Sequence, residues 1–181
     1  MKNIVLAIVL LFSIFTLQSQ NQNDTIVDPH EKDNEVKINA VFLLAGAFEG
    51  FYERNINEES SAGISVFLPF ANDIDYDINY YVSPYYRIFF GNKYAAGFFL
   101  EGFAMLNSVE REFSSGSNGN LTFEDKTVTD FALGFGLGSK WLTTGGFVFE
   151  LSGGIGRNLF ENDFDGESLV GKFGFNLGYR F

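Results

Sequence analysis

The nine residues 173–181 alternate strictly between large apolar and small or polar side chains. The large members are Phe173, Phe175, Leu177, Tyr179 and Phe181. An alternation of period two describes a β-strand with one apolar and one polar face. The ends of a soluble domain usually fray into water, whereas the closing strand of a transmembrane barrel buries such aromatic side chains in lipid. This segment therefore predicts the closing strand of a transmembrane β-barrel.

The beginning of the chain resembles an export signal. Lys2 precedes a nearly continuous apolar run over residues 4–17, which ends at the polar residues 18–20. This pattern predicts a cleaved signal peptide over 1–20. The run is shorter than the ~20 residues of a comfortable membrane helix, so a retained anchor is the weaker alternative. The chain has no cysteine, which excludes a lipoprotein anchor, a disulfide framework and a thiolate metal site.

Eight segments of alternating polarity follow a polar, acidic leader over 21–35. They cover about 36–45, 47–54, 62–70, 78–90, 94–111, 127–141, 147–159 and 169–181. We predict an all-β fold in which 36–181 forms one eight-stranded antiparallel transmembrane barrel. A single long strand over 36–54, which would leave seven strands, is the competing interpretation. Short connections (55–60, 91–93, 142–145) alternate with longer ones (71–77, 113–126, 160–168), and we place the short ones on the periplasmic side.

Glycine indicates which face of the strands points outward. The chain has 23 Phe and 20 Gly, and glycine is a poor helix former. In the segment 127–141, large residues such as Phe135 alternate with Gly134, Gly136 and Gly138. A soluble barrel would expose these glycines, although soluble proteins cover themselves with polar side chains. We therefore expect the apolar face to point outward and the glycines to make room inside for Phe67, Phe99 and Phe103. A soluble periplasmic ligand-binding barrel is the alternative.

Charged residues lie at inward positions of these segments. The predicted lumen network, in which Lys37 also takes part, comprises Glu49, Glu53, Arg87, Glu101, Asp130, Lys140, Glu150, Lys172 and Arg180. Buried charges are tolerated when they are paired, and eight strands leave an interior that side chains largely fill. We favour a structural network. A gated path for ions or small solutes is the alternative.

Three expectations concern individual positions. Pro84 cannot donate to a strand ladder, so we expect a β-bulge there. Arg157 lies on the outward face and is tolerable near the outer interface, where a charge costs about 0–1 kcal/mol. Trp141 and Tyr179, with Phe181, are expected in an aromatic girdle at the periplasmic interface.

Composition argues against several other functions. The net charge of −11 does not suit nucleic-acid binding, which needs clustered Lys and Arg. The only histidine, His30, lies in the leader, so a histidine-dependent outer-membrane enzyme is disfavoured. We predict no enzyme activity, no cofactor, no metal and no catalytic residue.

The acidic segment 73–77 places carboxylates at Asp73, Asp75 and Asp77. It starts like a calcium loop, but Ile78 and Pro84 stand where an EF-hand has Gly and Glu. A solvated acidic loop is the preferred interpretation. Loose Ca²⁺ or Mg²⁺ bridging to lipopolysaccharide phosphates is the alternative.

The export signal, the alternating segments and the terminal residues 178–181 resemble the small outer-membrane barrels of the OmpX and OmpA transmembrane-domain type. The segments 51–54, 84–87 and 154–158 are more closely similar to an uncharacterised domain-of-unknown-function family of such barrels. The resemblance covers about 36–181 and implies recognition of the last strand by the barrel-assembly machinery. The assembly signal that it implies comprises Phe173, Phe175, Leu177, Tyr179 and Phe181. We therefore expect a structural or surface-interaction role in the cell outer membrane, with lipid, lipopolysaccharide and possible contacts through loop 113–126.

Overall fold

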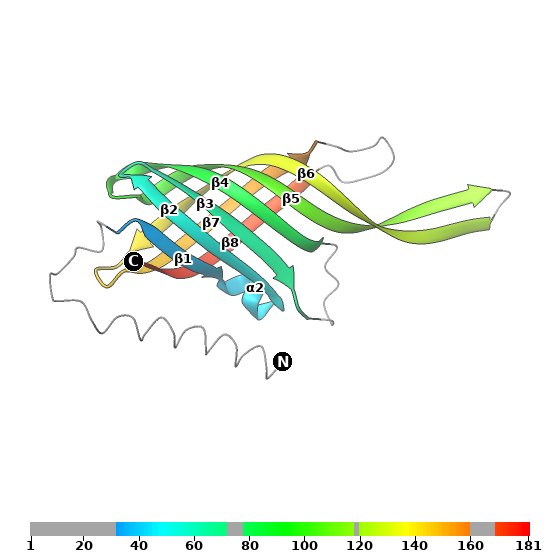
Figure 1. Ribbon diagram of the computed structural model, residues 1–181, viewed down its shortest axis with the longest axis horizontal. Helices are drawn as coiled ribbons and strands as arrows, with labels where there is room; N and C mark the ends of the chain where they lie inside the picture. The colour runs from blue at the N-terminus through cyan, green and yellow to red at the C-terminus, as the bar shows by residue number, and fades with distance from the viewer. Residues whose placement is uncertain (1–31, 72–77, 118–119, 160–168) are drawn as a thin grey trace.

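The structure, a computed structural model, describes residues 32–71, 78–117, 120–159 and 169–181. Eight strands pair in chain order and close into one antiparallel barrel, which confirms the predicted all-β, eight-stranded antiparallel architecture (Figure 1). The strands are β1 (Asn34–Asn39), β2 (Ala47–Asn57), β3 (Ser60–Pro69), β4 (Ile78–Lys93), β5 (Ala96–Ser117), β6 (Asn120–Leu142), β7 (Phe147–Asn158) and β8 (Leu169–Arg180). One short helix, α2 (Ala40–Leu44), follows β1. Within the described ranges no helix is long and apolar enough to cross a membrane.

The strand alternation separates a packed interior, which mixes charged and aromatic side chains, from an apolar exterior. On β4, buried Tyr85, Arg87 and Phe89 alternate with exposed Tyr86 and Ile88. The same pattern holds on β6, where Phe135 is 67% exposed. The buried residues elsewhere include many charged side chains beside the aromatic ones. The predicted outward orientation of the large apolar residues is correct.

The first hairpin differs from the expectation of a strand through residue 45. The chain leaves the sheet after Asn39, whose side-chain oxygen accepts hydrogen bonds from the backbone N–H groups of Val41 (3.1 Å) and Phe42 (3.4 Å). This N-cap starts α2. Gly46 then turns the chain with φ +86°, and a Cβ there would collide with the Cβ of Ala71. β1 and β2 are therefore separate strands, and the seven-stranded alternative is wrong.

The strand register does not shift at Pro84, so the predicted bulge is wrong. Pro84 pairs with Ile64 in β3, and the same register continues on both sides. The β5 side also keeps one register from Val82 to Tyr85. The Ser83 hydroxyl donates a 2.8 Å hydrogen bond to the carbonyl of Ala104, which this register places opposite the proline. A neighbouring side chain thus supplies a donor where proline has none.

The segment 113–126 is a paired hairpin rather than a loop, apart from residues 118–119, which lie outside the described residues. β5 and β6 contain 22 and 23 residues and pair as far as Ser117 and Asn120. Their ladders to the neighbouring strands end earlier, at Val109 towards β4 and at Ala132 towards β7. The hairpin consequently projects beyond the rest of the barrel (Figure 1).

The three short connections lie at the other end, together with the C-terminal residue. They join β2 to β3, β4 to β5 and β6 to β7, as predicted. The backbone N–H of Arg180 donates to Gly146 in the β6–β7 turn, and the Arg180 side chain reaches the β4–β5 turn. The predicted longer connections 71–77 and 160–168 lie outside the described residues, except for Ala71.

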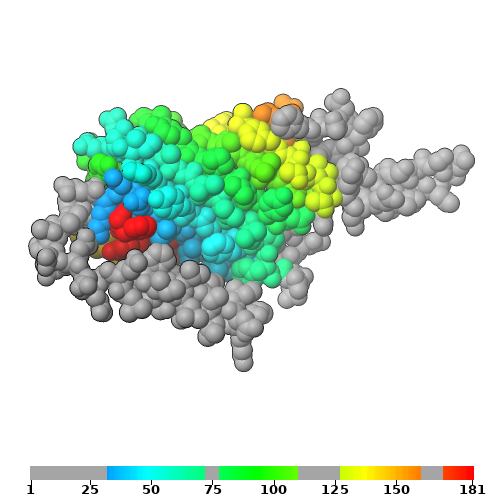
Figure 2. All heavy atoms as spheres, in the orientation of Figure 1, coloured from blue at the N-terminus to red at the C-terminus, as the bar shows by residue number. Residues whose placement is uncertain are grey.

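The barrel closes where β1 meets β8, and the closure extends to Phe181. Asn34 donates to the carbonyl of Phe181 (3.2 Å) and accepts from its N–H (2.8 Å). Figure 2 shows the red C-terminal residues against the blue residues of the first strand. β1 starts at Asn34, so Glu35, at the end of the expected leader, belongs to the barrel.

Candidate functional site

The lumen is filled by aromatic rings that lie over glycines of the neighbouring strand, at positions paired with them in the ladder. A Cβ on Gly134 would collide with the ring of Phe103, and a Cβ on Gly138 would meet the ring of Phe99. A Cβ on Gly63 would collide with the ring of Tyr85. The predicted role of the inward glycines is therefore visible in the structure, since each leaves space for a large side chain from another strand.

Glu53 lies at the centre of the lumen network. One of its carboxylate oxygens accepts from Lys37 (2.6 Å) and Arg87 (2.7 Å), and also from the Tyr85 hydroxyl (3.1 Å). The other oxygen accepts from Lys140 and from the Ser61 hydroxyl (2.7 Å). Glu53 is fully buried, and so are the charged ends of its two lysine partners. Five donors from the four strands β1, β3, β4 and β6 thus converge on one carboxylate.

Arg87 connects this centre to two further carboxylates. Its guanidinium binds Glu150 through both oxygens, at 2.8 and 3.0 Å, and donates from Nε to Glu101 at 2.8 Å. It also lies over the rings of Phe99 and Tyr85, with centroid distances of 4.3 and 4.4 Å. Glu150 additionally binds Lys37 at 2.7 Å. Bidentate, ring-stacked arginine holds its partners in fixed directions, so this part of the lumen is a rigid plug.

Arg180 fastens the end of the barrel that carries the short turns. Its Nε donates to Glu35 at 2.8 Å, and its two terminal nitrogens donate to the carbonyls of Tyr94 (2.9 Å) and Ala95 (2.8 Å). Ala95 has φ +42°, an unusual value for a residue with a side chain. The Tyr94 hydroxyl donates to Asp33 at 3.1 Å, and burial together with this hydrogen bond raises the pKa of Tyr94. The β4–β5 turn is thereby bound by Asp33, just before the first strand, and by Arg180, at the end of the last strand.

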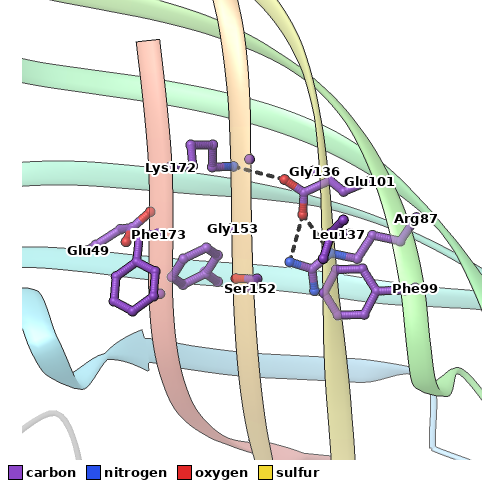
Figure 3. Close-up of a pocket in the computed structure, with 13 residues that line it drawn as sticks. Glu49, Arg87, Phe99, Glu101, Gly136, Leu137, Ser152, Gly153, Lys172 and Phe173 are labelled. Atoms are coloured by element: carbon purple, nitrogen blue, oxygen red, sulfur yellow. Dashed lines mark hydrogen bonds and ion pairs between the residues drawn. The ribbon is translucent and has the colours of Figure 1, made fainter.

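A small cavity lies in the lumen between Glu49, Glu101 and Lys172 (Figure 3). Glu49 accepts hydrogen bonds from the Tyr81 hydroxyl and from Asn39 (2.7 Å). Lys172 reaches Glu101 at 3.2 Å, and its side chain remains 10% exposed. Glu49, Glu101 and Lys172 line a cavity of about 10 Å³. A cavity of that size holds about one water molecule.

All nine residues of the predicted network lie on the inner face of the barrel. Eight of them are buried, and Lys172 is partly exposed. Ion pairs join seven of them around Glu53, Glu101 and Glu35. Glu49 is held by the neutral side chains of Tyr81 and Asn39. Asp130 lies further along β6, opposite Asn107. With Glu35 and Lys37 added, this ion-paired set contains, among the described residues, four carboxylates and five cations. It comprises Glu35, Glu53, Glu101, Glu150, Lys37, Arg87, Lys140, Lys172 and Arg180.

Sequence reasoning missed Glu35 and the neutral partners of the network. Glu35 lies two residues before Lys37, on the same face of β1. Extending the predicted first strand by one residue towards the N-terminus would have placed Glu35 in the lumen. Asn39, Tyr81 and Tyr85 gave no such signal, because a neutral polar or aromatic residue at an inward position does not indicate what it binds.

No group of three or more His, Cys, Asp or Glu side chains in the described part of the chain is arranged to hold a metal ion. His30 and the carboxylates Asp73, Asp75 and Asp77 lie outside the described residues. The interpretations that concern them therefore remain predictions.

Comparisons of the chain with protein families, with curated proteins and with solved structures find no match. The barrel and its lumen are consequently the basis for the functional argument.

Proposed function

We propose that this chain is an integral outer-membrane β-barrel with a structural role in the cell envelope, exported by the signal over 1–20, and that its long hairpin contacts partners at the surface. The observation that carries the proposal is the inverted distribution of side chains. Charged groups are buried inside, whereas the outer surface of every strand carries exposed large apolar residues. Soluble monomers rarely expose contiguous apolar surface beyond a few hundred Å².

Exposed aromatic residues near the short turns support the same proposal. Trp141, Phe147 and Tyr179 are exposed there, and the last two rings pack edge to face at 5.7 Å. Amphipathic rings gather at membrane interfaces. Arg157 is exposed near the opposite end of β7, in keeping with an outer-interface position. In this orientation the short turns face the periplasm, and the β5–β6 hairpin faces outside the cell.

The packed lumen favours a structural role over conduction. Arg87 and its carboxylates block the centre, the rings of Phe99 and Phe103 pack against the glycine wall, and the cavity beside Glu101 admits about one water molecule. An ion or small solute would have to break several buried ion pairs to pass. The packed lumen therefore supports a structural or surface-interaction role for the proposed barrel rather than a role as a pore.

Gel mobility of the outer-membrane fraction, boiled and unboiled in detergent, tests the membrane barrel. We expect a heat-dependent shift for the full chain and a weaker one for a chain lacking Phe181, because the deletion removes two backbone hydrogen bonds of the β1–β8 closure. Phe181→Leu keeps those bonds and separates their effect from that of the aromatic assembly signal. A soluble periplasmic protein without any shift would refute the proposal.

Single-channel recording on the purified barrel separates the structural role from the channel alternative. We expect no reproducible current steps. Steps that change in Arg87→Ala or Glu101→Ala would contradict the plugged lumen and support an ion channel.

A further inference from the structure

The connection between β1 and β2 has an unusual composition for a barrel connection. Residues 40–48 contain no polar or charged side chain. The turns at the other end are different: the β2–β3 turn contains Glu58 and Glu59, and the β6–β7 turn contains Thr143 and Thr144. Connections that face water normally carry polar turn residues. The first connection therefore does not have the composition of a water-exposed loop.

The helix in this connection has an inner and an outer side. Phe42 points inward, and its ring meets the ring of Phe67 edge to face at 5.2 Å. Val41, Leu43 and Leu44 are exposed, and Leu44 is 91% exposed. The backbone is satisfied locally, because Asn39 caps the first turn and the N–H of Ala45 donates to Val41. The outer side of α2 thus presents bare aliphatic side chains.

This aliphatic surface continues onto the wall of the barrel. The carbonyl of Gly46 accepts from the N–H groups of Phe70 and Ala71, both at 2.9 Å, which fixes the end of β3 beside α2. Phe48 and Leu68 then pair across β2 and β3. One apolar patch results, which we call the rim patch. It comprises Val41, Leu43, Leu44, Phe48, Leu68 and Phe70, all of them exposed.

We propose that α2 is an interfacial helix whose rim patch inserts into the outer leaflet, where it contacts the upper acyl chains of the lipid. This inference rests on the proposed function. The patch is continuous with the exposed apolar wall of β2 and β3, and short helices with a bare apolar side bury it about 5–10 Å into the headgroup boundary. A specific protein partner would require polar groups for orientation, and the patch has no polar side chain. The barrel is therefore flush with the membrane at α2 and stands above it at the β5–β6 hairpin.

Depth-dependent fluorescence quenching tests this position, since Trp141 is the only tryptophan. The variant Leu44→Trp with Trp141→Phe is folded into phosphatidylcholine vesicles whose acyl chains carry bromine near the glycerol end or near the methyl end. We expect the introduced indole to lose more of its emission to the shallow bromine than to the deep one, because an interfacial helix lies only about 5–10 Å into the headgroup boundary. Glu58→Trp with Trp141→Phe is the matched control, and its indole, in a polar turn, should keep its emission in both vesicles.

Trp141 of the native chain reports insertion in the same vesicles. If Trp141 is quenched while the indole at position 44 behaves like that at position 58, α2 lies in water, and this inference is wrong although the membrane barrel stands. If Trp141 is not quenched either, the proposed function itself fails. Heat-dependent gel mobility verifies that each variant has folded, and Leu43→Trp replaces the first variant if that one does not fold.

Discussion

Replacing Glu53 by Gln is the sharpest test of the lumen network. The substitution keeps the size of the side chain but removes the charge that faces Lys37, Arg87 and Lys140. It also replaces one of two acceptor oxygens by an NH₂ group. In one amide orientation the new NH₂ group faces the donors of Lys37, Arg87 and Tyr85. In the other orientation it faces the donors of Lys140 and Ser61. Either way, a buried lysine ammonium is left facing another donor.

The expected destabilisation is about 3–5 kcal/mol, the range for removing one partner from a buried ion pair. The lower end applies here, because each of the three cations keeps another carboxylate. Lys140 retains Glu35 at 2.9 Å, and both Lys37 and Arg87 retain Glu150. A loss of about 3 kcal/mol lowers the folding equilibrium constant roughly a hundredfold.

The measurement is reversible urea unfolding of the barrel in lipid vesicles, followed by the heat-dependent gel band. Glu58→Gln, in an exposed turn, is the matched control and should remain within about 0.5 kcal/mol of the native chain. If Glu53→Gln unfolds within 1 kcal/mol of this control, the convergence of donors on Glu53 does not stabilise the barrel, and the structural interpretation of the lumen is refuted.

Three further substitutions test other parts of the barrel by the same urea midpoint. Arg180→Lys keeps the charge but cannot reach both carbonyls of the β4–β5 turn, so we expect a loss of about 1–3 kcal/mol, and an unchanged midpoint would show that the turn holds without it. Gly134→Ala places a methyl group against Phe103 and should cost about 1–3 kcal/mol, whereas Gly102→Ala points into open space and should cost far less; equal losses would contradict the packing argument. Ser83→Ala removes the donor opposite the proline and should cost about 1 kcal/mol, while no loss would show that this carbonyl is satisfied otherwise.

The barrel could be predicted because its strands have two chemically different faces. Alternation fixes which residues share a face, and the glycines of β6 decide that the other face points outward. The inward charges followed directly from that register. Their partners did not, because residues such as Glu53 and Lys140 meet across the lumen from strands that are not neighbours in the sheet.

The errors arose where a local signal competed with the alternation. Residues 40–44 are almost uniformly apolar, and such a run does not distinguish strand from helix. The deciding residue was Asn39, whose side chain caps α2. At Pro84 we expected a bulge because proline has no N–H to donate, but the hydroxyl of the neighbouring Ser83 supplies the missing donor. The polar composition of 113–126 suggested a loop, but the backbone there continues the long ladder of β5 and β6.

The β1–β8 closure also has a consequence for folding kinetics. The other seven strand pairings join neighbours in the sequence, so each can form as a hairpin. Only this closure brings together residues such as Glu35 and Arg180, which are 145 positions apart. Closing so long a segment costs about 2 kcal/mol more entropy than closing a ten-residue hairpin. The hairpins can therefore assemble before the sheet closes, and until it closes Arg180 and Glu35 lack each other as partners, which makes this closure the expected slow step of folding.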